Sequence, residues 1–254
     1  MSRLDGHVAV VTGGNRGIGL GLAEGLVAAG ATVVVWARDT ARSAEACNRL
    51  DALAGSPGRA GAYSCDVSDE EQVDAAMAAT LADHGKVDSL FANAGVGGVV
   101  PFVDMTLDEW RRVMAVNLDG AFLTLRAAAR HLVARGDGGS LVGVSSVSAI
   151  HGAPRMEHYA ASKTALLALV RGLAVELARH RVRCNALLPG WTDTDMIEGG
   201  KANQRWVEAT IGRTPVRRWG VPADFRDIAA YLADPALTFH TGDSIVLDGG
   251  YSIY

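Results

Sequence analysis

Short runs of β-branched and apolar residues alternate with longer amphipathic stretches along the whole chain. Strands are expected over residues 7–12, 32–37, 60–66, 87–93, 140–146, 182–189 and 244–248. Helices are expected over residues 18–30, 40–54 and about 107–134, and from about residues 68, 158 and 222 onward. Strands that alternate with helices form a parallel sheet with helices on both faces, because the crossover connections are right-handed. The pattern therefore predicts an α/β protein with a single doubly wound parallel sheet.

Length and composition fit this fold. The chain has 254 residues, of which 49% are hydrophobic and 20% charged, and this favours one globular domain over residues 1–254. The formal net charge of −4 gives no reason to expect nucleic acid or an anionic membrane as a partner. We therefore expect a small molecule as the ligand.

Membrane and targeting segments are not expected. The N-terminus lacks the long apolar run of a signal peptide, and two charged residues, Arg171 and Glu176, interrupt the most apolar long stretch, 164–178. The cysteines are odd in number and far apart, which fits reduced thiols in a cytoplasmic protein. They are Cys47, Cys65 and Cys184.

Two local features concern the connections. Ser68 is expected to cap the third helix, with Glu71 three residues later as in a capping box. The stretch from Gly190 to Gly220 shows no clear periodicity. A loop of this length in a compact domain is more often a lid or binding loop than a plain connection, so we expect a substrate lid over about 190–220.

A glycine-rich turn, TGGNRGIG over residues 12–19, joins the first strand to the first helix. Its glycines at 13, 17 and 19 depart from the spacing GxGxxG. They serve the same physics, because glycine allows a tight turn and a close approach of the backbone to a ligand. The following helix N-terminus offers N–H groups and a positive dipole end to a diphosphate. Taken alone, the turn is also compatible with a structural role.

Tyr159 and Lys163 open the apolar stretch HYAASKTALLALV, and their spacing of four residues places them on one face of a helix. Lysine is rare here, since the 24 basic residues include only Lys86, Lys163 and Lys201. Position 163 therefore suggests a need for an ammonium group. By itself, the pattern YxxxK is more typical of a surface pair.

Five motifs occur together in one order: TGGNRGIG at 12–19, NAG at 93–95, a serine pair at 145–146, YAASK at 159–163 and PG at 189–190. With this set, the chain resembles the short-chain dehydrogenase/reductase family over essentially its whole length. The end of the chain, TGDSIVLDGGY, also resembles the C-terminal strand of that family. The resemblance implies a Rossmann-like fold and an oxidoreductase that interconverts a secondary alcohol and a ketone with a nicotinamide cofactor.

The resemblance also implies catalytic roles. Tyr159 matches the catalytic acid/base and Lys163 its partner. Ser146, thirteen residues before Tyr159, matches the serine that orients the substrate. Asn117, in MAVNLDG, matches the asparagine that holds a proton-relay water. Ser145 and Ser148 are expected to be bystanders.

A cofactor site is implied along the same sheet edge. Asn93 matches the residue that steadies the central strand beside the cofactor, and Asp66 with Val67 matches the pair that contacts adenine. Thr192 and Thr194 match the segment that binds the nicotinamide carboxamide. The full set of implied cofactor residues is Gly13, Asn15, Arg16, Gly17, Ile18, Gly19, Arg38, Asp66, Val67, Asn93, Ala94, Gly95, Tyr159, Lys163, Pro189, Gly190, Thr192 and Thr194.

The chemistry explains the rare lysine. Reduction of a ketone leaves an alkoxide that must take a proton, and a free tyrosine with a pKa of about 10 is a poor base near neutrality. An ammonium group one helical turn away favours the tyrosinate, so Lys163 is expected to lower the pKa of Tyr159. Lysine can also bind ribose hydroxyls and pass a proton, which a permanently charged arginine cannot do. Ser146 is expected to stabilise the developing negative charge on the substrate oxygen.

The tip of the second strand bears on the choice of cofactor. An acidic residue there would bind the ribose hydroxyls and select NAD, but this chain has Ala37 followed by Arg38. With Arg16 from the glycine-rich turn, Arg38 is expected to clamp a 2′-phosphate, which favours NADP(H). Asp39 leaves NAD possible, because its side chain either caps the next helix or reaches the ribose.

Several alternatives stay open at this stage. A dinucleotide-binding sensor without chemistry, or a reductase of imines or enones, would share most of the motifs. The histidines form no metal-ligand motif, and we expect no metal. His151 and His158 flank the active-site loop, where they either contact the substrate or hold ordinary loop positions. The large side chains of the 190–220 stretch line an apolar pocket, pack the lid against the body or form a subunit contact; they are Trp191, Met196, Trp206 and Trp219. The family resemblance implies a homotetramer.

Overall fold

The computed structural model describes residues 3–254 and contains one seven-stranded parallel sheet in the order β3-β2-β1-β4-β5-β6-β7. The strands are β1 Val8–Thr12, β2 Thr32–Ala37, β3 Ala60–Ser64, β4 Ser89–Ala92, β5 Gly139–Val144, β6 Val182–Pro189 and β7 Ser244–Leu247. Between β1 and β4 the chain reverses the direction in which it adds strands. This topology confirms the predicted doubly wound, Rossmann-like α/β fold.

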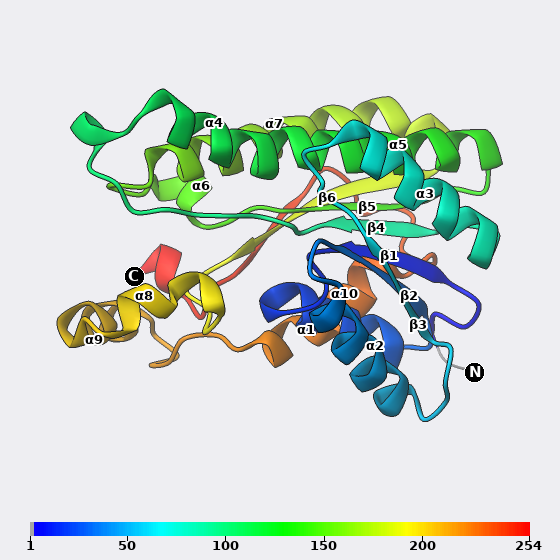
Figure 1. The fold of residues 1–254 in the computed structure, drawn as a ribbon, viewed down its shortest axis with the longest axis horizontal. Helices are drawn as coiled ribbons and strands as arrows, with labels where there is room; N and C mark the ends of the chain where they lie inside the picture. The colour runs from blue at the N-terminus through cyan, green and yellow to red at the C-terminus, as the bar shows by residue number, and fades with distance from the viewer. Residues whose placement is uncertain (1–2) are drawn as a thin grey trace.

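Helices cover both faces of the sheet (Figure 1). Helices α1, α2 and α10 lie on one face, and α3, α4, α5, α6 and α7 lie on the other. Their bounds are α1 Gly17–Ala28, α2 Thr40–Ala54, α3 Glu70–His84, α4 Leu107–Met114, α5 Gly120–Arg135, α6 Ser148–His151, α7 Glu157–Leu177, α8 Glu198–Lys201, α9 Gln204–Arg213 and α10 Arg226–Ala233. None of the helices within residues 3–254 is both long and apolar enough to cross a bilayer.

The two hydrophobic cores follow from the alternation of side chains along the strands. Val8 and Val10 of β1 pack on the α3, α5 and α7 side, whereas Ala9 and Val11 pack on the α1 and α10 side. Successive strand residues point to opposite faces, so strands buried on both faces read as continuous apolar runs. This is why the strand positions could be read directly from the sequence.

Helix α1 lies unusually close to the start of α10, and glycines make the approach possible. A Cβ atom on Gly21 would lie 1.9 Å from the carbonyl oxygen of Pro222, and one on Gly25 would lie 2.0 Å from that of Arg226. Between these glycines, the carboxylate of Glu24 is buried and accepts hydrogen bonds of 2.8 and 2.6 Å from Arg226. The close packing holds the N-terminus of α1 in place at the sheet edge.

The ends of two helices differ from the sequence expectations. Asp69, not Ser68, caps α3, because its carboxylate accepts a hydrogen bond of 3.2 Å from the backbone N–H of Gln72. Ser68 instead donates to Asp66 at 2.7 Å. The long helix expected over about 107–134 is interrupted by one π-helical turn, Ala115–Asp119, which separates α4 from α5.

The region expected to be irregular, 190–220, contains helical structure instead. A 3₁₀ turn, Asp195–Ile197, precedes α8 and α9. Aromatic packing holds these helices, since the rings of Trp191 and Trp206 lie 4.9 Å apart and those of Trp206 and Trp219 lie 5.3 Å apart. Figure 1 shows α8 and α9 beside the C-terminus, at one end of the sheet. We call residues 190–220 the lid region below.

The approach of α1 to α10 leads to a stability prediction. Gly25→Ala should lower the melting temperature by about 4–8 °C, because the methyl group overpacks against the Arg226 backbone at a cost of about 3 kcal/mol. This loss should exceed the gain of about 1 kcal/mol from the better helix propensity of alanine. Thermal unfolding followed by circular dichroism measures the change. Gly212→Ala in α9, where the methyl group meets nothing within 4 Å, is the matched control and should melt at or slightly above the wild-type temperature.

Candidate active site

Hydrogen bonds between the ends of β1 and β4 fix the centre of the sheet edge. The hydroxyl of Thr12 accepts from the backbone N–H groups of Asn93 and Ala94 at 3.0 and 2.9 Å. The side-chain amide of Asn93 donates to the carbonyl of Thr12 at 2.9 Å. These contacts join the glycine-rich turn to the NAG segment at the point where the chain reverses direction across the sheet.

The glycine-rich turn is shaped for close contact. Gly13 and Gly17 have φ values of 63° and 52°, in the left-handed region that favours glycine. A Cβ on Gly19 would lie 2.2 Å from the carbonyl oxygen of Gly13. Arg16 precedes α1, and its side chain makes no capping hydrogen bond. An uncapped helix N-terminus behind a glycine turn offers donors for an anion, so the residues present fit the diphosphate of a dinucleotide.

Tyr159 and Lys163 lie in the first two turns of α7, beside the end of β5. The ammonium group of Lys163 is almost fully buried, donates to the carbonyl of Val144 at 2.8 Å and lies 5.7 Å from the ring centre of Tyr159. Burial lowers the pKa of Lys163 to about 8. The structure therefore brings the pair together in a low-dielectric pocket, not on the surface.

The pKa of Tyr159 differs from the expectation. Burial raises it above 10.0, and a hydrogen bond with Ser146 acts in the opposite direction. Lys163 is not among the groups that shift it, because its ammonium hydrogen-bonds Val144 and lies over the ring instead of at the phenol oxygen. The expected lowering by Lys163 is therefore absent in the chain by itself.

The two serines after β5 have different partners. The hydroxyl of Ser146 pairs with that of Ser148 at 3.2 Å and accepts from the backbone N–H of Ser148 at 3.1 Å. The hydroxyl of Ser145 is buried and donates to the carbonyl of Lys163 at 2.8 Å. Ser146 thus lies beside Tyr159, whereas Ser145 ties β5 to α7.

Asn117 lies in the π-helical turn and is fully buried. Its amide oxygen accepts from the backbone N–H of Val96 at 2.8 Å, and its amide nitrogen donates to the Val96 carbonyl at 2.9 Å and to Ser162 at 3.2 Å. A Cβ on Gly95 would lie 3.4 Å from both the Asn117 side-chain oxygen and the Lys163 ammonium. Asn117 therefore braces the loop after β4 close to Lys163.

The segment after β6 crosses over the glycine-rich turn. Thr192 is buried, and its hydroxyl donates to the carbonyl of Gly190 at 3.0 Å. The methyl group of Thr194 lies 3.2 Å from the position of a Cβ on Gly17. The nicotinamide-binding segment expected from the sequence is thus adjacent to the turn expected to bind the diphosphate.

Arg16 and Arg38, which were expected to clamp a 2′-phosphate together beyond β2, have separate acidic partners. Arg38 is exposed and lies 3.5 Å from Asp66. Arg16 does not turn toward Arg38 but pairs with Asp195 at 3.1 Å. Asp39 caps α2 by accepting from the backbone N–H of Arg42 at 3.0 Å, so its carboxylate is held at the helix start.

Two contacts near the site had no sequence signal. Arg42 pairs with Asp195 at 2.8 Å, although the two residues are 153 positions apart. His158, expected in a loop, is buried in α7, and its Nε2 lies 3.3 Å from Glu109 of α4. His158 therefore contacts the helix behind the site.

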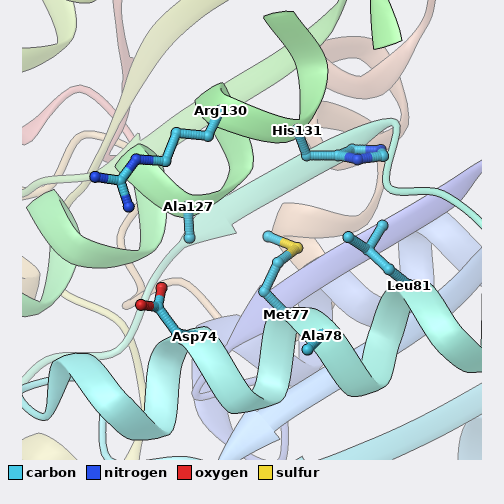
Figure 2. Close-up of a pocket in the computed structure, with 7 residues that line it drawn as sticks. All are labelled: Asp74, Met77, Ala78, Leu81, Ala127, Arg130 and His131. Atoms are coloured by element: carbon cyan, nitrogen blue, oxygen red, sulfur yellow. The ribbon is translucent and has the colours of Figure 1, made fainter. Parts of the chain in front are cut away.

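A second hollow lies between α3 and α5 and contains none of these residues (Figure 2). It is lined by Asp74, Met77, Ala78, Leu81, Ala127, Arg130 and His131. In the part of the chain that the structure describes, no group of three or more His, Cys, Asp or Glu is placed to hold a metal ion. The hydrogen-bonded ends of β1 and β4, with Lys163 beside them, make the sheet edge the candidate active site.

Comparisons with known proteins agree with this geometry. The sequence profile of a family described as enoyl-(acyl carrier protein) reductase matches residues 13–252. The chain is 35% identical over 251 residues to L-rhamnose 1-dehydrogenase (NAD(P)(+)) of Sphingomonas sp. (strain SKA58), covering 98% of each chain.

Two solved structures are also similar over the full length. One is a short-chain type dehydrogenase/reductase from Mycobacterium marinum, with a TM-score of 0.92, 34% identity and coverage of 99% of this chain and 97% of that chain. The other is a gluconate 5-dehydrogenase from Burkholderia cenocepacia J2315 in complex with NADP and tartrate, with a TM-score of 0.93, 34% identity and coverage of 99% and 97%. The chain therefore belongs to the short-chain dehydrogenase/reductase family and is an NAD(P)-dependent dehydrogenase acting on CH–OH groups.

Proposed function

We propose that this protein interconverts a secondary alcohol of a sugar or sugar acid and the corresponding ketone. The meeting of Ser146, Tyr159 and Lys163 beside the glycine-rich turn is the observation that carries the proposal. The relatives that act on L-rhamnose and gluconate support a polyhydroxylated substrate. A sensor without chemistry, the alternative left open by the sequence, receives no support from these relatives, which are named as dehydrogenases.

The mechanism assigns a task to each of these side chains. When bound, the nicotinamide cofactor accepts a hydride in oxidation and donates it in reduction. Tyr159 exchanges the proton of the substrate oxygen, and Ser146 hydrogen-bonds that oxygen as negative charge develops. Lys163 binds the nicotinamide ribose hydroxyls, and Asn117 keeps the loop after β4 in position beside it. Exclusion of water by the lid region strengthens these interactions.

The cofactor residues follow the same edge of the sheet. The glycine-rich turn, with Gly13, Gly17 and Gly19, binds the diphosphate, and Asp66 binds the adenine. Thr192 and Thr194 hold the nicotinamide carboxamide. These assignments are supported by the uncapped N-terminus of α1 and by the close approach of Thr194 to Gly17.

We propose a preference for NADP(H). Ala37 ends β2 without a carboxylate, and the exposed guanidinium of Arg38 follows it. Arg16 precedes α1 and Arg42 lies in the first turn of α2, and both guanidinium groups pair with Asp195. The relative crystallised with NADP is consistent with this preference.

An oligomer, with a homotetramer as the expected form, is also part of the proposal. Apolar side chains on α5, α7, β7 and the C-terminus are exposed, which supports burial against other copies. They are Phe122, Val175, Val246, Ile253 and Tyr254. The cytoplasmic location expected from the cysteines stays a prediction; Cys47, Cys65 and Cys184 are all free thiols.

The proposed chemistry predicts the effect of removing one hydroxyl group. A panel of sugars, sugar acids and simple secondary alcohols should contain substrates that change the cofactor absorbance at 340 nm, which reports nicotinamide reduction. Tyr159→Phe should then lose turnover by about 10²-fold or more, the typical range for a lost general acid/base, while the Kd for the cofactor stays near the wild-type value. Near-native turnover of Tyr159→Phe would refute the mechanism. Activity only on enones or imines would replace the proposed substrate class. Enones belong in the panel because the matched family is described as enoyl-(acyl carrier protein) reductase.

The proposed cofactor preference makes a separate prediction. Wild type should show a higher kcat/KM with NADPH than with NADH, and Arg38→Ala should lose much of that difference, because the guanidinium no longer pairs with the 2′-phosphate. Arg179→Ala, which removes an exposed arginine beyond the far end of α7, is the matched control and should keep the wild-type ratio. A wild-type preference for NADH of tenfold or more, about 1.4 kcal/mol, contradicts the proposal.

The lid region generates a third prediction. Residues from about 193 to 215 should exchange backbone amide hydrogens more slowly once cofactor is bound, because the segment closes over the site and excludes water. Hydrogen exchange followed by mass spectrometry compares the free and bound protein. The core strand β5, which should be protected in both states, is the internal reference. Unchanged protection across 193–215 would show that the region is not a lid.

A further inference from the structure

One carboxylate joins the lid region to the corner beyond β2. The same oxygen of Asp195 accepts hydrogen bonds from Arg16 at 3.1 Å and from Arg42 at 2.8 Å. Arg16 precedes α1 and Arg42 lies in the first turn of α2, so three distant segments meet at this oxygen. The two guanidinium groups hold the pKa of Asp195 below its usual value, and Asp195 is therefore ionised near neutrality.

The two arginines that Asp195 holds face the tip of β2. Asn15 donates to the carbonyl of Asp39 at 3.3 Å and to the hydroxyl of Ser43 at 3.2 Å, which ties the glycine-rich turn to the start of α2. This link brings Arg16 and Arg42 to the same corner as Arg38. Arg42 also lies 3.8 Å from Asp39, and Arg38 lies 3.5 Å from Asp66.

The position of Asp195 in the chain gives it a second connection. Thr194, the preceding residue, belongs to the segment proposed to hold the nicotinamide carboxamide. Its methyl group lies 3.2 Å from the place that a Cβ atom on Gly17 would occupy. The following residues form the 3₁₀ turn Asp195–Ile197, which leads into α8. A change at Asp195 therefore acts on the start of the lid region.

We infer that Asp195 sets the cofactor selectivity by competing with a 2′-phosphate for Arg16 and Arg42. A dinucleotide that carries the phosphate displaces the carboxylate from the guanidinium groups. A dinucleotide without the phosphate leaves both ion pairs in place. The inference rests on the proposed position of the adenine ribose, but it does not require that the wild-type enzyme prefer NADP(H).

The size of the effect follows from the exposure of these groups. The side chains of Arg16 and Asp195 are each 58% exposed and that of Arg42 is 48% exposed, so solvent screens both ion pairs. Removing the competing charge should strengthen binding of a 2′-phosphate by about five- to tenfold, as expected for two screened pairs. Binding of the same ligand without the 2′-phosphate should change by less than about twofold, because its 5′-phosphate is proposed to bind the backbone N–H groups of the glycine-rich turn and not the guanidinium groups.

Two small ligands isolate this corner from the rest of the cofactor. Adenosine 2′,5′-bisphosphate carries the phosphate and adenosine 5′-monophosphate lacks it, and isothermal titration calorimetry measures the Kd of each. Asp195→Asn should bind the bisphosphate about five- to tenfold more tightly and the monophosphate equally well. Asp193→Asn is the matched control, because Asp193 lies in the same segment but pairs with Lys201. It should leave both Kd values unchanged.

The remaining variants separate competition from other roles. Arg42→Ala should weaken binding of the bisphosphate only, and the added substitution Asp195→Asn should then produce a smaller gain than it does in wild type. The bisphosphate lacks the nicotinamide half over which the lid region is proposed to close. Hydrogen exchange over residues 195–201 should therefore rise when wild type binds this fragment and stay constant with the monophosphate. In Asp195→Asn, the two ligands should have the same effect on this exchange.

The outcomes are distinguishable from those of the proposed function. If Asp195→Asn leaves the bisphosphate Kd unchanged or weakens it, Asp195 does not compete and the inference is wrong, whichever cofactor wild type prefers. If wild type prefers NADH but Asp195→Asn still gains affinity for the bisphosphate, the proposed NADP(H) preference fails and the role of Asp195 stands. A thermal melt of each variant confirms that the comparison is between folded proteins.

Discussion

The hydrogen bonds between Thr12 and Asn93 hold together the two strands at which the chain reverses direction across the sheet. In an open parallel sheet, helices on either side of such a point leave a crevice at the carboxyl ends of the strands. The hydroxyl of Thr12 accepts hydrogen bonds from the backbone N–H groups of Asn93 and Ala94, and the side-chain amide of Asn93 donates to the carbonyl of Thr12. The glycine-rich turn, the NAG segment and the serines after β5 are thereby fixed relative to one another before any ligand is bound.

Burial decides the protonation of the residues in this crevice. It lowers the pKa of Lys163 and raises that of Tyr159, so each shift favours the neutral form of its group. The neutral phenol is the form that donates a proton, which suits reduction of a ketone near neutrality. Oxidation of an alcohol needs the tyrosinate, and the chain by itself does little to stabilise it beyond the hydrogen bond with Ser146. In the proposed mechanism, the oxidised nicotinamide ring would supply further positive charge that favours the tyrosinate.

The sequence is most informative where structure depends on local patterns. The inner strands β1, β2, β4, β5 and β6 are buried on both faces, so apolar runs mark them, whereas the edge strands β3 and β7 are only partly buried. The motif residues follow the strands in order. Asp69 caps α3, while the neighbouring Ser68 donates a hydrogen bond to Asp66. Both residue types are good helix caps, so the sequence does not show which of the two caps the helix. The ion pairs of Asp195 join residues far apart in the chain, and no periodicity reports such contacts.

The helices of the lid region illustrate the same limit. The stretch from Gly190 to Gly220 lacks a clear periodicity, and Pro215 near its end interrupts regular structure. Tertiary packing overrides this local preference, since Trp206 is held between Trp191 and Trp219. Helix propensity is a weak influence compared with the burial of large aromatic rings.

The lid region is attached to the body by two different kinds of interaction. Near α9, the ring of Trp191 packs edge-on against that of Tyr251, which lies outside the region, with 6.4 Å between the ring centres, and this contact does not depend on ion pairs. At the start of the region, Asp195 is held by exposed ion pairs, and another anion can take its place on the arginines. Movement should therefore be concentrated at the charged attachment, with the aromatic cluster as the fixed support. This division lets the cofactor act on the lid without unfolding it, because only the weak interactions have to exchange.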